Sequence, residues 1–114
     1  MKRILILGGT RYLGKAVVNK IKNHTKFDVA TLSRSKEKTD IKHFICDRKK
    51  TSELKKKIIN FNPIIILDMI NFNGEDINQM LTLYEKKFLN ELTQYVMISS
   101  FFVYISLASL SSIA

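Results

Sequence analysis

A glycine-bearing turn near the amino terminus is the first segment whose residues could do chemistry. Gly8-Gly9-Thr10-Arg11-Tyr12-Leu13-Gly14 directly follows the apolar run 4–7. A short apolar run that ends at a glycine is typical of a buried strand, and the residues after the turn have helical spacing. Amide hydrogens at the start of a helix attract anions. The segment therefore predicts a pyrophosphate site, in which Gly8 permits the tight turn and Gly14 permits close packing of helix on strand. A strand-to-helix turn without a ligand is the alternative.

A second candidate feature lies where the second apolar run ends. At this point of a dinucleotide-binding domain, an acidic residue favours NAD, whereas an Arg accommodates the phosphate of NADP. This chain has Ser33-Arg34 there, with Lys36 and Lys38 close by. The residues favour NADP, and a solvated basic loop is the alternative.

The elements that must position these residues alternate between apolar strands and amphipathic helices. Strands are expected over residues 4–7, 27–32, 41–46, 64–68 and 95–98. Helices are expected from Tyr12 to about Asn23, from an N-cap at Thr51 to a stop at Asn62-Pro63, and along an apolar stripe from Ile77 to Phe88. Such alternation predicts an α/β fold with a parallel sheet and helical cover.

Composition is that of one folded domain. The 114 residues are 46% hydrophobic and 25% charged, which is the balance of a globular chain. The net charge of +9 suits anionic partners such as dinucleotides, RNA or acidic lipid, although a Lys-rich bias also arises in low-GC genomes. Cys46 is the only cysteine, so an intramolecular disulfide is excluded and a reducing compartment, the cytoplasm, is favoured.

Two further features argue against other classes of site. His43 and Cys46 lie three residues apart on one expected strand, so their side chains project to opposite faces and no metal site is expected. Residues 95–114 carry no charge, a length that could cross a bilayer. The six serines within this run and the strand-like alternation of its first part disfavour a membrane span.

Four segments follow one another along the chain: Leu7–Gly14, Cys46-Asp47-Arg48, Leu67-Asp68-Met69 and Ile98–Tyr104. Together, and in this order, they resemble the NAD-dependent epimerase/dehydratase family, a group of extended or atypical short-chain dehydrogenases/reductases. The resemblance covers residues 1 to about 104, the amino-terminal part of the family. It implies a Rossmann-like, doubly wound sheet of five strands in the order 3-2-1-4-5, with NADP or NAD as cofactor and a nucleotide sugar as the full-length family's substrate.

The resemblance also implies roles for individual residues. Asp47 and the adjoining Arg48 would lie near the adenine ring, and Asp68 and Met69 would line the cofactor cleft. Ser100 matches the family's catalytic Ser or Thr, which hydrogen-bonds a substrate hydroxyl or carbonyl. The remaining implied cofactor contacts are Gly8, Gly9, Thr10, Arg11, Tyr12, Leu13, Gly14, Ser33 and Arg34. Arg11 replaces the middle glycine of the usual motif, although an Arg could itself bind phosphate.

The chain departs from the family in its catalytic part. The family's acid–base chemistry uses a Tyr and a Lys four residues later, but the residues four after each tyrosine are Ala16, Phe88, Ser99 and Ala108. The sequence ends ten residues after Tyr104, and Ile105 stands where a glycine is usual. We therefore expect a truncated or frameshifted product: a cofactor-binding domain over residues 1–104 with an apolar tail over 105–114, catalytically incomplete. An uncovered fifth strand would cause marginal stability or self-association.

Two functions from other classes remain as alternatives. The Gly-Gly-Thr-Arg group also resembles chloroplast stem-loop RNA-binding proteins, and the positive charge would suit phosphate contacts. A membrane-tethered fragment would rest on the uncharged tail alone.

Overall fold

A five-stranded parallel sheet organises the chain. The computed structural model describes residues 2–8, 12–24, 26–69, 74–85 and 94–97. The strands are β1 (Lys2–Leu7), β2 (Phe27–Ser33), β3 (Lys42–Ile45), β4 (Ile65–Asp68) and β5 (Gln94–Met97), in the order β3-β2-β1-β4-β5. Every neighbouring pair is parallel. The predicted α/β, Rossmann-like sheet and its strand order are confirmed.

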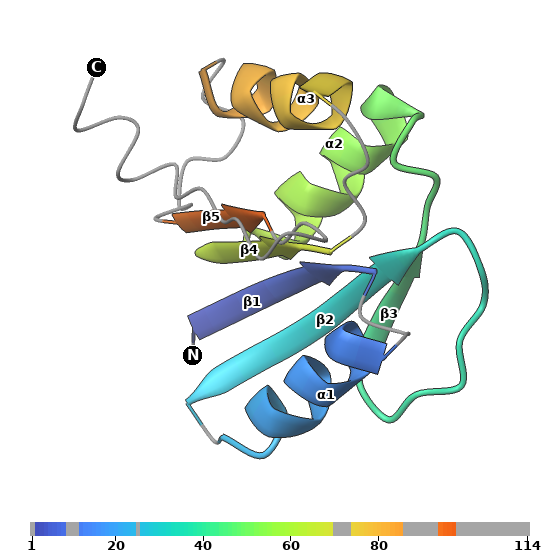
Figure 1. The fold of residues 1–114 in the computed structure, drawn as a ribbon, viewed down its shortest axis with the longest axis vertical. Helices are drawn as coiled ribbons and strands as arrows, with labels where there is room; N and C mark the ends of the chain where they lie inside the picture. Colours follow the sequence, from blue (N-terminus) through green and yellow to red (C-terminus); the bar gives the residue numbers. More distant parts are fainter. Residues whose placement is uncertain (1, 9–11, 25, 70–73, 86–93, 98–114) are drawn as a thin grey trace.

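Helices cover both faces of this sheet. They are α1 (Tyr12–Ile21), α2 (Thr51–Phe61) and α3 (Gly74–Glu85). Figure 1 shows α1 on one face and α2 and α3 on the opposite face. The strand order explains this arrangement, because crossovers between parallel strands are right-handed. The chain passes from β1 to β2 in one direction across the sheet, which places α1 on one face. It passes from β3 to β4 and then to β5 in the opposite direction, which places α2 and α3 on the other face.

The central strand β1 is buried on both faces. Leu5 and Leu7 pack in a core with residues of α2 and α3, whereas Ile4 and Ile6 pack in a second core with Val18 of α1. All four side chains are at most 3% exposed. Side chains alternate between the faces of a strand, so a continuous apolar run serves both cores at once.

The start of α2 corrects one expectation. Lys50, not Thr51, occupies the N-cap position, and Thr51 is the first helical residue. The chain enters the helix through a turn in which Asp47 Oδ1 accepts the Lys49 amide at 3.0 Å and the Asp47 carbonyl accepts the Lys50 amide at 2.9 Å. Lys50 makes no side-chain cap hydrogen bond, so the helix begins without the hydroxyl cap that Thr51 was expected to supply.

The end of α2 agrees with the sequence. Asn62 follows the helix in the left-handed region, with φ 53° and ψ 60°, and its amide donates to the Ile58 carbonyl. Asparagine tolerates this conformation better than most residues, and Pro63 cannot continue a helix.

Other strand and helix boundaries shift by one to three residues, the largest shift being at α3, which begins at Gly74 and not at Ile77. β3 is shorter than expected, although the Cys46 amide still donates to the Ser33 carbonyl at 2.8 Å. α1 ends at Ile21 and not near Asn23. No helix within the described ranges is long and apolar enough to cross a membrane. Residues 98–114, which include most of the uncharged run, lie outside the described residues.

Candidate functional site

The carboxyl ends of the five parallel strands lie along one edge of the sheet. The Gly8 amide donates to the Leu32 carbonyl at 2.8 Å, and the Met69 amide donates to the Leu7 carbonyl at 3.0 Å. These bonds continue the ladders beyond the strand ends. At this edge the chain turns to β2 on one side of β1 and later reaches β4 on the other, which is the switch point where open α/β sheets bind ligands.

Gly8 has the conformation that a tight phosphate-binding turn needs. Its φ is 86°, in the region where a Cβ clashes with the backbone. Four residues later the chain begins α1, and Gly14 is buried in the first turn of that helix. Gly8 permits the tight turn and the buried Gly14 permits close packing of α1 on the sheet, and this geometry fits a pyrophosphate at the start of α1. Gly9, Thr10 and Arg11 lie outside the described residues, as do the side chains of Tyr12 and Leu13.

The end of β2 brings two more predicted residues to this edge. Ser33 is buried, and its hydroxyl donates to the Ser35 carbonyl at 3.1 Å. Arg34 is exposed. The guanidinium is therefore accessible to an anion at the strand position that reads the ribose in dinucleotide-binding domains.

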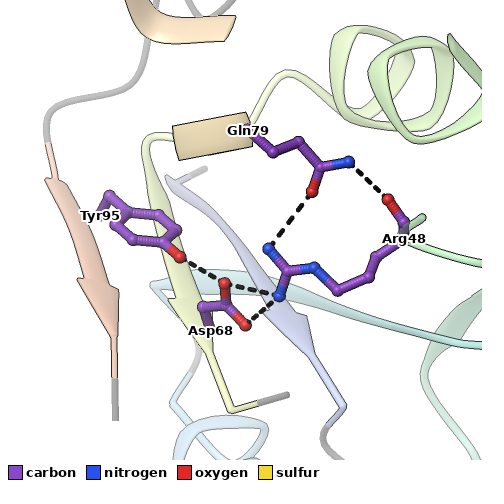
Figure 2. Close-up of polar contacts among 4 residues, drawn as sticks. All are labelled: Arg48, Asp68, Gln79 and Tyr95. Atoms are coloured by element: carbon purple, nitrogen blue, oxygen red, sulfur yellow. Dashed lines mark hydrogen bonds and ion pairs between the residues drawn. The ribbon is translucent and has the colours of Figure 1, made fainter. Parts of the chain in front are cut away.

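Arg48 and Asp68 lie in the protein interior, where they bind each other. Arg48 Nη1 donates to Asp68 Oδ1 at 2.6 Å and to Oδ2 at 2.7 Å. The two residues are 5% and 0% exposed. The Tyr95 hydroxyl donates to Asp68 Oδ2, so the carboxylate lies between a guanidinium and a phenol (Figure 2).

Gln79 completes this cluster from α3. Its Nε2 donates to the Arg48 carbonyl at 2.5 Å and to Thr51 Oγ1 at 3.0 Å, and its Oε1 accepts from Arg48 Nη2 at 3.4 Å. We call Arg48, Asp68, Gln79 and Tyr95 the buried polar cluster. It joins the β3–α2 turn, β4, α3 and β5 (Figure 2).

The environment keeps Tyr95 protonated. Burial raises the pKa of the Tyr95 hydroxyl, and the negative charge of Asp68 raises it further. A phenol that keeps its proton is a donor to Asp68 and not a base. Arg48 and Asp68 contact each other, Gln79 and Tyr95, and so link the β3–α2 turn to β4, α3 and β5.

Sequence reasoning missed Tyr95 and Gln79. A tyrosine in an apolar strand does signal a hydroxyl that needs a buried partner, but it does not say which partner. Gln79 carries no such signal, because polar residues are ordinary on helix surfaces.

Asp47 and Met69 flank the buried polar cluster at the same edge. Asp47 is half-buried and its carboxylate accepts the Lys49 amide. Met69 packs against the core under α1. Cys46 is buried on the α2 side, and burial, followed by the charge of Glu53, raises the pKa of its thiol. Ser100 lies outside the described residues.

A cavity of about 280 Å³ lies at the other end of the sheet. It is lined by residues that begin β2 and β3, among them Phe27 and Lys42, and by the ion pair of Lys22 Nζ with Asp40 at 3.3 Å. Because Gly8 and Ser33 are at the opposite strand ends, this cavity is separate from the candidate site.

Comparisons with known proteins bear on the fold. No family model and no curated protein matches the chain. Among solved structures, the chain is similar to a dTDP-glucose 4,6-dehydratase of Bacillus anthracis in complex with NAD, with 12% identity, a TM-score of 0.67, and coverage of 87% of this chain and 37% of that one. A UDP-N-acetylglucosamine 4-epimerase of Bacillus cereus has 21% identity, a TM-score of 0.63, and coverage of 85% and 36%.

A third similar structure is a UDP-glucose 4-epimerase of Thermotoga maritima with UDP-glucose. It has 13% identity, a TM-score of 0.63, and coverage of 83% of this chain and 37% of that one. The chain spans little more than a third of the length of these three proteins. At such identities the likeness establishes a shared Rossmann-like fold.

Proposed function

We propose that residues 1–104 are the NAD(P)-binding part of an epimerase/dehydratase-like short-chain dehydrogenase/reductase, followed by the tail 105–114. The observation that carries this proposal is Gly8, which has φ 86° at the switch point, between β1 and the helix that follows. The similar folds of a dehydratase in complex with NAD and an epimerase with UDP-glucose support it. The buried Cys46 suits a reducing compartment, and we propose the cytoplasm.

In this proposal the residues at the carboxyl edge of the sheet each contact a different part of the cofactor. The turn from Gly8 to Gly14 binds the pyrophosphate, and Ser33 and Arg34 bind the adenosine ribose, with Arg34 on the phosphate of NADP. Asp47 lies near the adenine, and Met69 lines the cleft. Arg48 and Asp68 act indirectly. Their contacts with each other and with Tyr95 hold the ends of the strands that form the cleft. The bound cofactor would supply hydride transfer.

We further propose that these 114 residues bind cofactor without completing the reaction. No tyrosine among them is followed four residues later by a lysine, so the family's acid–base pair is missing from this stretch. Ser100 would hydrogen-bond the substrate, for which a nucleotide sugar is the proposed class.

Titration with NADPH and with NADH, followed by cofactor fluorescence or by heat, tests the proposal. We expect both to bind and NADPH to bind more tightly. Arg34→Asp should weaken NADPH about tenfold or more, because an Arg–phosphate contact is replaced by repulsion, and should weaken NADH less. Lys38→Asp is the matched control, with the same change of charge on the same loop.

Two outcomes would contradict this assignment. Equal effects of Arg34→Asp on NADPH and NADH would refute the role of Arg34. Failure of the unaltered chain to bind either dinucleotide would refute the proposed function. If the chain then bound an RNA oligonucleotide with a steep loss of affinity in salt, the RNA-binding alternative would replace it.

A further inference from the structure

A hydrogen-bonded group on the α1 face of β2 and β3 has no part in the site described above. Thr31 and His43 are partners in the parallel register of these strands. Thr31 Oγ1 lies 2.7 Å from His43 Nδ1, and His43 Nε2 lies 2.9 Å from the Ser35 carbonyl oxygen. The imidazole therefore bridges from the middle of β2 to the loop that follows β2.

The contacts determine where the imidazole carries its proton. A carbonyl oxygen can only accept, so the hydrogen is on Nε2 and is donated to Ser35. In a neutral imidazole Nδ1 then accepts a hydrogen bond from the Thr31 hydroxyl. Thr31 is 2% exposed. Both ring nitrogens of a neutral His43 are satisfied, which holds the ring in one orientation.

The Ser35 carbonyl is held by two side chains at once. It accepts from His43 Nε2 at 2.9 Å and from the Ser33 hydroxyl at 3.1 Å. Ser33 also lies within 3.3 Å of the same ring nitrogen. Arg34 is between these two serines, so the backbone on its carboxyl side is tied to the sheet while its own side chain is exposed.

We propose that His43 is a positioning residue for cofactor recognition: it fixes the turn from Ser33 to Ser35 and thereby presents Arg34 to the 2′-phosphate of NADP. This inference rests on the proposed dinucleotide function. A fixed turn loses less conformational freedom when the phosphate binds, which increases the affinity for NADPH. The affinity for NADH does not increase, because NADH has no such phosphate.

Two polar replacements separate the contacts of His43. In His43→Gln the amide nitrogen reaches the position of Nε2, so donation to Ser35 is retained. In His43→Asn the shorter amide reaches only the position of Nδ1, so the contact with Thr31 is kept and that with Ser35 is lost. Thr31→Val removes the hydroxyl that orients the ring and tests the same bridge without changing His43.

The measurement is the ratio of the dissociation constants for NADPH and NADH, with thermal melting as a check of folding. We expect His43→Asn to weaken NADPH about fivefold to tenfold, the cost of one hydrogen bond, and to leave NADH within twofold. His43→Gln should restore NADPH to within about twofold of the unaltered chain on the same scale. Thr31→Val should fall between the two.

Amide hydrogen exchange of residues 33–36, measured without ligand, tests whether His43 fixes the turn and does not depend on the proposed function. Exchange there should be faster in His43→Asn than in His43→Gln. Equal exchange in the two variants, or an equal loss of NADPH and NADH affinity, would overturn the inference. If the unaltered chain bound no dinucleotide at all, the proposed function would fail and the link from His43 to the cofactor would fail with it.

Discussion

At the scale of single residues, the buried polar cluster concentrates most of the interior charge that the described residues show. Asp68 is fully buried beside Arg48 at 2.6 Å, while the pair of Lys22 with Asp40 lies near the surface. Removing one member of a buried pair leaves a charge without compensation, whereas an exposed pair is screened by water. The two pairs should therefore respond differently to the same kind of substitution.

Arg48→Met should lower the free energy of unfolding by about 3–5 kcal/mol, because Asp68 would remain buried without its cation. Urea denaturation followed by circular dichroism measures this change. Lys22→Met is the control and should cost less than about 1 kcal/mol. The double variant Arg48→Met with Asp68→Asn should recover part of the loss, since no unpaired charge remains. A loss for Arg48→Met no greater than that for Lys22→Met would show that the buried pair is not important for stability.

Tyr95 should make stability fall at alkaline pH. Burial raises its pKa in the folded chain above the ordinary value of 10.0. Above that value the unfolded chain releases a proton that the folded chain retains, so rising pH favours unfolding. The stability supplied by protonated Tyr95 is thus present below pH 10.0 and is lost progressively above it.

Tyr95→Phe isolates this effect. We expect it to cost about 1 kcal/mol at neutral pH, where a hydrogen bond to Asp68 is lost. Its urea midpoint should decline less than that of the unaltered chain between about pH 8 and about pH 11, because only the unaltered chain has the Tyr95 hydroxyl and the two proteins are otherwise identical. Parallel declines would contradict the assignment.

At the scale of elements, most boundaries follow from local pattern. The apolar run 4–7 predicts a strand buried on both faces, and β1 is one. The stop of α2 follows from Asn62-Pro63. The start of α2 could not be placed from Thr51 alone, because the turn around Asp47 depends on how the chain leaves β3. Which residue occupies the N-cap position depends on the backbone conformation before the helix as well as within it.

The left-handed conformation of Asn62 gives a prediction for α2. Asn62→Ala should destabilise the protein by about 1 kcal/mol, because a Cβ without a local polar partner is unfavourable at positive φ. Asn62→Gly should be neutral or stabilising, since glycine adopts this region without steric cost. Lys56→Gly, in the exposed middle of the same helix, should instead cost about 1 kcal/mol. Thermal melting compares the three, and an Asn62→Gly variant weaker than Asn62→Ala would contradict the cap.

At the scale of the whole molecule, the outer edge of β5 is the feature that bears on assembly. Within the described ranges, β5 pairs with β4 and with no other strand. Parallel edges with free amides invite pairing with another chain. We propose that the protein self-associates through this edge.

A proline scan of β5 tests this proposal. The Gln94 amide donates to the Ile64 carbonyl, so by alternation the amide of Val96 faces β4 and that of Met97 faces outward. Met97→Pro should abolish self-association and leave the melting temperature nearly unchanged, whereas Val96→Pro should lower it by breaking the ladder. Sedimentation at roughly 100 µM measures assembly. A monomeric unaltered chain at that concentration would refute the proposal.

The sequence by itself determined the order of elements, the double burial of β1 and the parallel arrangement of the sheet, because neighbours in the chain set periodicity and turns. It also located Gly8, whose freedom of φ the turn requires. Only the tertiary structure joined Arg48 to Asp68, 20 residues on, and to Gln79, 31 residues on, and brought His43 against Thr31. The physical reason is range: such partners meet only after packing has decided which strands are adjacent and which face each side chain takes.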